Sequence, residues 1–219
     1  MFKSKMKRTA KRISRRPLNA MLAEFVRAIP EGSRVLNIGS GGEVMDVIKK
    51  AMRPHVQIVS TDIDPARKPD VVDDITDTKI DPESFDYIIC AEVMEHVNEP
   101  FKAAENIHNI LRHGGKAFVS TPFQFPLHDA PYDYFRYTEF GLKNIFNRFR
   151  VAEVRPRGTW GSAILLLVLR SLWFGDRRID AAVHLMILWN LPLILILRPL
   201  LGTTKTPYLC SGFVCNLEK

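Results

Sequence analysis

Apolar residues along this chain fall into short runs separated by longer segments of mixed polarity. The short runs stand at 34–38, 56–60, 71–72, 85–90, 116–120 and 151–155. Several of them stop at glycine, aspartate or proline, as buried strands of a parallel sheet do where they feed a turn. A further run at 208–217 predicts a final strand close to the C-terminus.

The clearest longer segment, 17–30, carries apolar residues at spacings of three and four, which is the period of an amphipathic helix. These positions are Leu18, Met21, Leu22, Phe25, Val26 and Ile29. Helices are also predicted over 43–52, 100–111 and 137–149, the last with Thr138 as a candidate N-cap. Strands that alternate with helices predict an α/β fold with a mostly parallel sheet and helices on both faces.

Two strongly apolar stretches, 163–174 and 181–201, flank a polar link at 175–180. The first would reach about 18 Å as a helix, short of a bilayer core of about 30 Å. Because the final strand is expected to return to the same sheet, the chain cannot cross a membrane once between them. We therefore predict an apolar helical hairpin over 158–205, inserted before the last strand and lying on or re-entering a membrane. A buried hairpin covering the sheet and a dimer interface are the alternatives.

The charge of the chain is concentrated at its start. The formal charge is +7, and eight of the 31 Lys and Arg residues lie in the first sixteen positions, so the remainder holds 23 basic against 24 acidic residues. This distribution disfavours a domain whose whole surface grips nucleic acid. It predicts a basic tail over 1–16, beside one α/β domain formed by 17–157 and 206–219. Tail and hairpin together supply the two signals that reversible binding to an anionic membrane surface requires.

The three cysteines, Cys90, Cys210 and Cys215, are too few for a disulfide framework and form no C-x-x-C pair. They favour a reduced chain on the cytoplasmic side of the membrane.

Candidate chemistry stands at the ends of the predicted strands, where open α/β sheets bind their ligands. The glycine turn 39–42 follows the first strand, but Val44 replaces the third glycine of a dinucleotide-binding turn. The turn therefore suits a nucleoside ligand without a pyrophosphate. Asp62 can accept hydrogen bonds from ribose hydroxyls, and Asp74 from an adenine amino group, with Ile63 and Ile75 as apolar walls.

A second group of polar residues follows the strand at 85–90. Glu92, Glu95 and His96 lack the first histidine of an H-x-x-E-H metal motif, so no metal site is expected, and Glu95 and His96 are expected to shape the cleft.

The loop 126–138 contains two prolines and is rich in His, Asp, Tyr and Arg, which is typical of functional loops. Within it, His128 can take a proton from a substrate hydroxyl. Arg136 either pairs with Asp133 or holds a carboxylate or phosphate of the substrate.

The runs VLNIGSGG, STDIDP, VVDDITD, SFDYIICAEVMEHV and ILRHGGKAFVSTP together resemble class I S-adenosylmethionine-dependent methyltransferases of the small-molecule branch. The resemblance covers about 35–149 and implies a Rossmann-like fold with S-adenosylmethionine as cofactor. The loop 126–138 resembles that of methyltransferases found with glycan and cell-envelope biosynthesis. The cofactor-binding residues that the resemblance implies, with Asn37 in place of the usual acid, are Asn37, Gly39, Ser40, Gly41, Asp62, Ile63, Asp74, Ile75, Cys90 and Glu92.

We therefore predict a methyltransferase acting on a hydroxyl of a glycan, a lipid-linked sugar or another amphiphile. The residues CAEV stand where amine methyltransferases carry [DNS]-P-P-[YFW], which favours oxygen as the acceptor. The predicted catalytic residues are His96, His128, Asp133 and Arg136. Two alternatives remain: a non-catalytic scaffold, suggested by Asn37 and Glu43, and an RNA methyltransferase that uses the tail. The sequence leaves the oligomeric state open.

Overall fold

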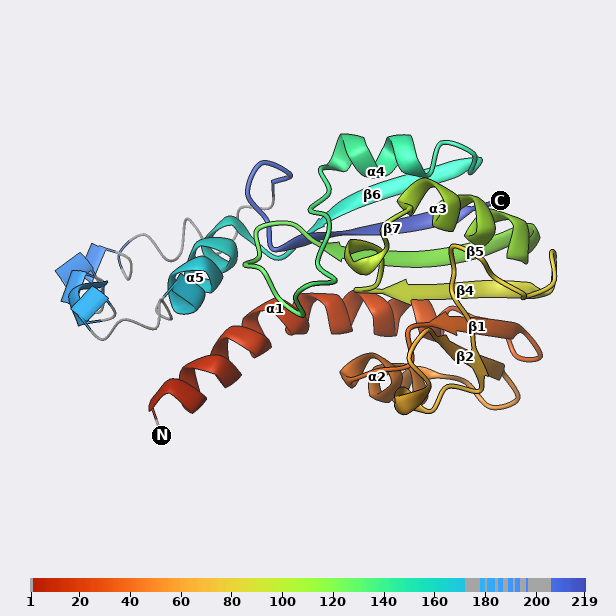
Figure 1. Cartoon of the computed structure of the whole chain (residues 1–219), viewed down its shortest axis with the longest axis horizontal. Helices are drawn as coiled ribbons and strands as arrows, with labels where there is room; N and C mark the ends of the chain where they lie inside the picture. The colour runs from red at the N-terminus through yellow and green to blue at the C-terminus, as the bar shows by residue number, and fades with distance from the viewer. Residues whose placement is uncertain are drawn as a thin grey trace.

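A computed structural model describes residues 2–171, 178–179, 181–183, 185–186, 189–190, 192–193, 196 and 206–219. Its centre is a seven-stranded sheet in the order β3-β2-β1-β4-β5-β7-β6. The pairs among β1 to β5 are parallel, whereas β7 runs antiparallel to both of its neighbours (Figure 1). This is the Rossmann-like sheet that the alternation of strands and helices predicted.

The strands follow the predicted apolar runs closely. Their bounds are β1 Arg34–Ile38, β2 Gln57–Asp62, β3 Val71–Val72, β4 Phe85–Ala91, β5 Leu111–Pro122, β6 Val151–Arg157 and β7 Gly212–Glu218. β5 begins at Leu111, earlier than predicted, and includes the glycines at 114 and 115. Its register with β4 shifts between Phe85 and Tyr87, opposite this part of the strand. The final strand is shorter than the predicted 208–217 at its start, where the chain turns before Gly212.

Helices cover both faces of the sheet. They are α1 Phe2–Arg27, α2 Glu43–Ala51, α3 Pro100–Ile110, α4 Glu139–Ile145 and α5 Trp160–Ser171, with the 3-10 turns η1 Pro65–Arg67 and η2 Met94–His96. Thr138 caps α4 by accepting a hydrogen bond from the Gly141 amide, as predicted. This helix is shorter than the predicted 137–149: Tyr137 lies before it, and its hydroxyl donates to the Met94 carbonyl.

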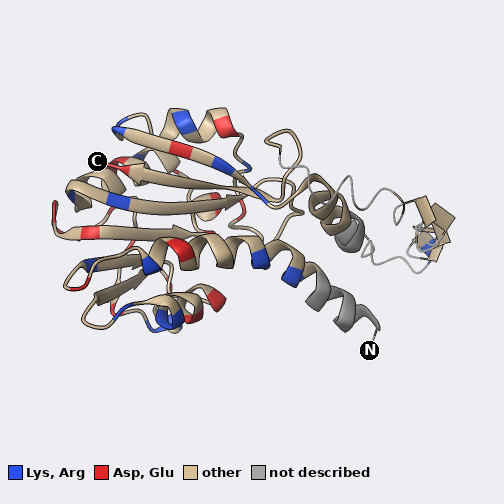
Figure 2. Cartoon of the chain, turned by 180° about the vertical axis from the view of Figure 1, so that it is seen from behind, with Lys and Arg blue, Asp and Glu red and all other residues tan. Residues whose placement is uncertain are grey.

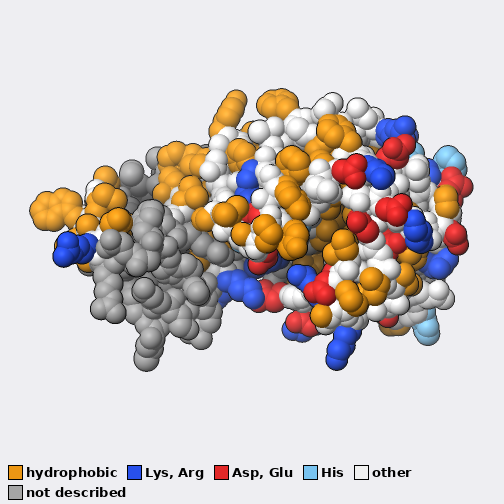
Figure 3. All heavy atoms as spheres, viewed as in Figure 1, with side chains coloured by type: hydrophobic (Ala, Val, Ile, Leu, Met, Phe, Trp, Pro, Cys, Tyr) orange, Lys and Arg blue, Asp and Glu red, His pale blue; other side chains and the backbone are white. Residues whose placement is uncertain are grey.

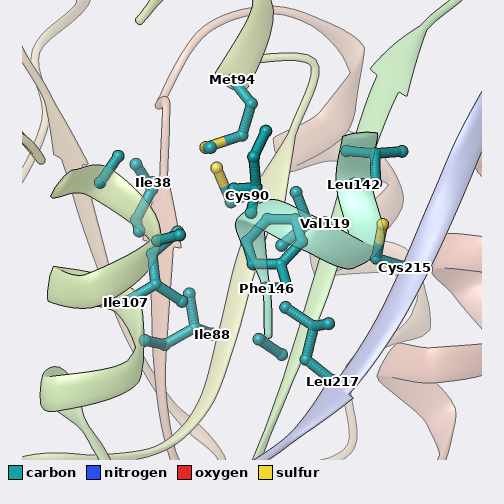
Figure 4. Packing of buried hydrophobic residues seen from close by; sticks show 14 of the residues in the cluster. Ile38, Ile88, Cys90, Met94, Ile107, Val119, Leu142, Phe146, Cys215 and Leu217 are labelled. Atoms are coloured by element: carbon teal, nitrogen blue, oxygen red, sulfur yellow. The ribbon is translucent and has the colours of Figure 1, made fainter. Parts of the chain in front are cut away.

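Each face of the sheet has its own apolar core. Leu18, Leu22 and Val26 of α1 pack with α2 against one face, on Val35 and Phe118. α3 and α4 cover the other face. There Ile88, Cys90, Val119 and Leu217 of the strands meet Ile107, Leu142 and Phe146 (Figure 4). Each large apolar side chain buried in this way contributes about 1.5–3 kcal/mol, so the two layers fix the strand ends that carry the polar residues.

The N-terminal region differs from the prediction. Residues expected to form a separate tail belong to one helix, α1, which runs through Pro17 without a break. Figure 2 shows Lys and Arg positions in blue on α1 where it leaves the sheet, and the described basic residues there are Lys11, Arg12, Arg15 and Arg16. The second half of α1 is the predicted amphipathic segment, and it packs on the sheet.

The predicted hairpin over 158–205 lies in large part outside the described residues. α5, which begins it, packs against α1 and buries Ala163 and Leu166. Several described residues between 178 and 196 have exposed apolar side chains, led by Trp189 at 87% and Ile196 at 74%. Among the described residues, no helix combines the length and the apolar character needed to cross a bilayer.

Candidate functional site

A cavity of about 1100 Å³ lies at the carboxyl ends of the parallel strands. Its walls come from the turns after β1, β2, β3 and β4, from α1 and from the loop 123–138. Most of the predicted site residues line it: Gly39, Gly41, Asp62, Ile63, Asp74, Ile75, Glu92, His96 and His128. Five predicted residues do not line it: Asn37, Ser40, Cys90, Asp133 and Arg136.

The glycine turn after β1 lets the backbone come close to the cavity. Gly39 has a φ of +87°, and a Cβ there would lie 2.6 Å from a methyl group of Val93. A Cβ on Gly41 would collide with the guanidinium of Arg67, which also lines the cavity. Side chains at these positions would therefore strain the turn or fill the space in front of it.

Asp62, at the end of β2, connects the glycine turn to the cavity. Its Oδ2 accepts a hydrogen bond from the Ser40 amide at 2.9 Å, and its Oδ1 accepts one from the Asp64 amide at 3.0 Å. Ser40 therefore acts by holding this carboxylate in place. Asn37 is fully buried and donates to the Gly39 carbonyl at 2.9 Å, so it braces the turn from behind.

The adenine-binding residues predicted at the end of β3 form a compact turn. Asp74 Oδ1 accepts hydrogen bonds from the amide and the hydroxyl of Thr76, both at 2.8 Å. Ile75 is buried, whereas Ile63 is 67% exposed, and both line the cavity together with Asp74. This part of the wall therefore offers apolar surface and one carboxylate to a flat ring.

These walls fit an S-adenosyl group. Gly39 and Gly41 bring the backbone of the turn to the cavity, and Asp62, Ile63 and Ile75 line the same cavity. One buried polar atom next to the turn, Asn37 Oδ1, has no hydrogen-bond partner among the described residues. These are the groups that a nucleoside with an amino-acid end requires.

Cys90 is a correction to the predicted site. Its side chain is fully buried in the core beside Met94, on the face of the sheet covered by α3 (Figure 4). Burial raises the pKa of its thiol well above the ordinary value. Ala91, the last residue of β4, and Glu92, which follows the strand with a φ of +59°, line the cavity in its place.

Glu92 lines the cavity but is held from behind by a buried arginine. Arg157, only 1% exposed, donates to both carboxylate oxygens of Glu92, at 2.7 and 3.1 Å. Ser120 donates to the same carboxylate at 3.0 Å. Burial is the largest single influence and would raise the pKa of Glu92. The charge and hydrogen bonds of Arg157, with smaller contributions from Arg15 and Ser120, together outweigh it, so the pKa lies below its ordinary value. Glu92 is therefore an ionised carboxylate held by Arg157, the last residue of β6.

Asp133 and Arg136 form the internal brace of the loop 123–138. The guanidinium of Arg136 donates to both oxygens of Asp133, at 2.6 and 2.7 Å, and to the carbonyls of Phe125, Pro126 and Phe135. These bonds hold the pKa of Asp133 far below its usual range. Of the two roles weighed for Arg136, the structure therefore shows the pair with Asp133.

The brace presents two histidines to the cavity. His128 Nδ1 lies 3.1 Å from Asp133 Oδ2, and His96 Nδ1 lies 2.7 Å from the Tyr132 carbonyl oxygen. The Tyr132 carbonyl only accepts hydrogen bonds, so His96 Nδ1 carries a proton. His128 Nδ1 has two neighbours of opposite kind, the Asp133 carboxylate and the guanidinium of Arg136, whose Nη2 lies 3.3 Å away. Burial lowers the pKa of His128, which keeps its ring neutral at neutral pH.

Glu95 completes this part of the wall. Its Oε1 lies 3.8 Å from His96 Nε2 and 4.0 Å from His128 Nε2. Ligand atoms of the three side chains lie within 4.8 Å of one another, close enough to surround one oxygen atom or one small cation. The sequence placed Glu95 in the cleft without assigning it a role and gave no reason to expect this convergence.

Sequence reasoning also missed Arg15 and Arg157. Arg15 lines the cavity because residues 2–16 continue the helix α1 toward it, and the sequence did not predict a helix there. Arg157 reaches Glu92 from 65 positions away, and no local pattern marks such a contact. Tyr132 and Tyr134 line the cavity from the polar loop, which the sequence did single out as functional.

Comparisons with known proteins agree with this site. A family profile described as "Methyltransferase domain" matches residues 6–155. A ubiquinone biosynthesis O-methyltransferase of Xanthomonas axonopodis pv. citri is 31% identical over 159 residues, which cover 65% of this chain and 61% of that protein. One from Coxiella burnetii is 28% identical over 147 residues, covering 59% of this chain and 55% of that protein. The chain thus spans about three fifths of the length of these relatives.

Solved structures share the fold at lower sequence identity. An S-adenosylmethionine-dependent methyltransferase of Archaeoglobus fulgidus superposes with a TM-score of 0.60 at 14% identity, covering 95% of this chain and 97% of that one. Phosphoethanolamine N-methyltransferase 2 of Haemonchus contortus, in complex with S-adenosylmethionine, gives a TM-score of 0.58 at 17% identity, covering 92% and 52%.

Proposed function

The chain belongs to the family of S-adenosylmethionine-dependent methyltransferases, and from that premise we propose that it transfers a methyl group to a hydroxyl of an amphiphilic small molecule. The observation that carries the proposal is the pair of histidines, His96 and His128, in the wall of a cavity suited to the cofactor, with His128 Nδ1 3.1 Å from the Asp133 carboxylate. The relatives are named O-methyltransferases, which favours oxygen as the acceptor atom here as well.

In this proposal the walls after β1, β2 and β3 bind the cofactor, with Asp62 on the ribose and Asp74 at the adenine. When bound, S-adenosylmethionine supplies a methyl group already activated on its sulfonium. The chain's own residues therefore need to place an oxygen in line with that group and remove one proton, which proximity and a single base can accomplish.

His128 is the proposed base. Its Nε2 takes the hydroxyl proton while the acceptor oxygen forms its bond to the methyl carbon and the leaving sulfur keeps the electron pair. Asp133 holds the Nδ1–H of His128 and stabilises the imidazolium that results. Arg136 fixes Asp133, and so positions the base without touching the acceptor. His96, with its ring centre 5.0 Å from that of His128, forms the other side of the acceptor site.

The acceptor is proposed to reach the cavity from an anionic membrane on its cytoplasmic side, as a lipid-linked sugar or a similar amphiphile. Lys11, Arg12 and Arg16 are exposed on α1. In the view of Figure 3, hydrophobic side chains gather around α5 and the loop after β5. Most of the charged side chains in this view lie elsewhere on the surface. Exposed apolar residues beside a basic helix are the combination that favours binding in the interface of a bilayer.

A methyl-transfer assay tests the proposal. Purified protein is incubated with S-adenosylmethionine labelled in its methyl group and a detergent extract of membranes from cells that carry this chain, and the labelled product is identified by mass spectrometry and NMR. Label on an ether or ester oxygen of an amphiphile supports the proposal. Label on nitrogen or on RNA, or no transfer into any fraction, contradicts it, and the last result would favour a scaffold.

A further inference from the structure

A second cavity, of about 380 Å³, lies between α1 and the start of α5. These two helices lie side by side (Figure 1). The described residues that line the second cavity are Arg12, Ile13, Arg16 and Pro17 of α1, with Gly158, Thr159 and Ser162. None of them lines the cavity at the strand ends, so the second cavity is a separate place on the molecule.

The positive charge of the second cavity is unopposed. Arg12 and Arg16 stand four positions apart and therefore share one face of α1. Among the described residues, neither guanidinium has an ion pair or a hydrogen bond, whereas the neighbouring Lys11 pairs with Glu43 at 2.7 Å. Positions 1–23 and 158–175, which supply the whole lining, contain no Asp or Glu. Both guanidinium groups are thus available for an anion from outside the chain.

The opposite wall adds a hydroxyl donor. The Thr159 hydroxyl accepts a hydrogen bond from the Ser162 amide at 3.3 Å, and its own hydrogen has no acceptor among the described residues. Gly158 brings no side chain into the second cavity, since its φ is +81° and a Cβ there would lie 2.8 Å from Ser162 Oγ. Two guanidinium forks and a hydroxyl are groups that bind phosphate oxygens well, because a planar fork matches two oxygens at once.

Apolar groups lie beside these donors. Ile13 and Pro17 form a second row on the same stretch of α1 and also line the second cavity. On α5, Leu165 follows Ser162 by one turn and is 41% exposed. A small soluble phosphate ester would leave this apolar surface in water, whereas the acyl chains of a lipid would cover it. The combination favours a phosphate carried by a lipid.

We propose that the second cavity binds the phosphate ester of a membrane lipid, with Arg12 and Arg16 on the phosphate oxygens and the exposed apolar surface of α5 beside the acyl chains. The inference rests on the membrane part of the proposed function and sharpens it. General attraction between a basic helix and an anionic surface becomes binding of one chemical group at one place. No step of methyl transfer is needed for it.

The second cavity is joined to the cavity at the strand ends through two short connections. Arg15 lines the cavity at the strand ends, and the next residue, Arg16, lines the second one. Arg157 holds Glu92, and the next residue, Gly158, lines the second cavity. A lipid phosphate bound between α1 and α5 would therefore hold at the membrane the same segments that border the proposed site of methyl transfer.

Vesicles that differ only in the anionic group test the chemistry. Full-length protein is floated with vesicles of a neutral galactolipid made anionic by phosphatidic acid or, to the same surface potential, by oleate. We expect about 10-fold tighter binding to the vesicles with phosphatidic acid, because carboxylate and phosphate then differ in geometry and not in surface charge. Equal affinity for the two would show that charge alone attracts the protein, and would overturn the inference.

Variants that keep the charge test the place. Arg12→Lys combined with Arg16→Lys removes both forks and should weaken binding to the vesicles with phosphatidic acid by about 10-fold. Arg27→Lys, at the exposed last position of the same helix, is the matched control and should bind as the wild type does. Ile13→Phe fills part of the second cavity without changing the charge and should also remove the preference for phosphate.

Circular dichroism verifies that each variant folds. Wild-type binding by the folded double variant, or equal losses in the double variant and in Arg27→Lys, would overturn the inference.

A soluble ester distinguishes the two sources of phosphate. Calorimetric titration with glycerol 3-phosphate should give an affinity at least about 10-fold lower than that for the lipid, since the soluble ester covers no apolar surface. Equal affinity would assign the second cavity to a soluble ligand and overturn the inference. None of these measurements contains S-adenosylmethionine. Failure of methyl transfer would therefore end the proposed activity alone, and loss of the preference for phosphate would end this inference alone.

Discussion

The two halves of the cavity are built in different ways. The cofactor half consists of turns that directly follow β1, β2 and β3. Its polar groups bond within one turn, as Asp74 does to Thr76, or between the ends of neighbouring strands, as Asp62 does to Ser40. The acceptor half joins distant segments: Glu92 of the β4 end is held by Arg157 of β6, and His128 of the loop 123–138 faces Glu95 of η2. One half is built from adjacent strand ends and their turns, whereas the other also depends on contacts between segments far apart in the sequence.

This difference has a functional consequence. Local turns preserve a binding site for a constant ligand even when the rest of the domain changes. Long-range contacts allow the acceptor half to differ between members of a family while the sheet stays the same. The two halves should therefore respond separately to substitution, and each of the following changes tests that separation.

The largest effect is expected for His128→Ala. Removing the base should lower the rate of methyl transfer by about 100- to 10,000-fold. Affinity for S-adenosylhomocysteine should stay within about threefold, because His128 belongs to the acceptor half. The control is His113→Ala, an exposed histidine paired with Glu83, which should leave both quantities unchanged. Equal loss of rate and of affinity would show that the two halves are not separate.

The second largest effect is expected for Arg157→Leu, which should lower the stability of the fold. It leaves the carboxylate of Glu92 buried without its partner, which should reduce the free energy of unfolding by about 3–5 kcal/mol. Arg148→Leu removes an exposed pair with Glu105 and should cost no more than about 1 kcal/mol. Urea denaturation of both variants measures the difference. Similar losses for the two would mean that the Glu92–Arg157 pair does not hold the acceptor half together.

A smaller effect is expected at the membrane. Arg12→Gln combined with Arg16→Gln should weaken binding to vesicles containing phosphatidylserine by about 1 kcal/mol per residue. Lys49→Gln combined with Lys50→Gln makes the same change of charge on α2, away from the exposed part of α1, and should have little effect. Flotation at increasing salt measures both. Equal weakening by the two pairs would show that net charge, and not the position of α1, governs binding.

The smallest effect is a shift of the acid limb of the pH profile. His128 must be neutral to act as base, and its pKa is lowered by burial, so activity should persist below the ordinary histidine value of 6.5. Asp133 opposes this shift, so Asp133→Asn should move the limb to still lower pH. The other groups that face His128, which are His96, Arg136 and Asp129, are left unchanged in that variant. A limb that moves to higher pH in Asp133→Asn would show that His128 is not the titrating base.

The acid limb also has a consequence for stability. The folded-state pKa of His128 lies below its unfolded value, so the folded chain binds fewer protons than the unfolded chain between the two. Acidification through this range therefore lowers the free energy of unfolding contributed by His128.

Most of the fold could be predicted because short apolar runs and helical spacing report local structure directly. The prediction was wrong about the start of α1, because a run of basic residues looks like a solvated tail, while Lys and Arg are good helix formers and Pro17 did not end the helix. The predicted hairpin at 158–205 stays a prediction, since much of it lies outside the described residues.

The cofactor half of the site was largely predictable, since each residue sits at the end of a strand that the sequence shows. Cys90 was misplaced because the register of side chains on β4, inward or outward, depends on packing against α3. The partners of the acceptor half could not be predicted: Arg157 and Glu92 are 65 positions apart, and only the fold brings Glu95 beside His128. The roles assigned to all these residues stay predictions.

Calorimetric titration with S-adenosylhomocysteine tests the central claim most directly. The wild-type chain should bind, and Asp62→Ala should bind about 10- to 100-fold more weakly, since hydrogen bonds to a charged group contribute about 1.5–3 kcal/mol. His128→Ala should bind as the wild type does. Absence of binding by the wild type, or equal losses for Asp62→Ala and His128→Ala, would contradict a cofactor site built at the ends of β1, β2 and β3.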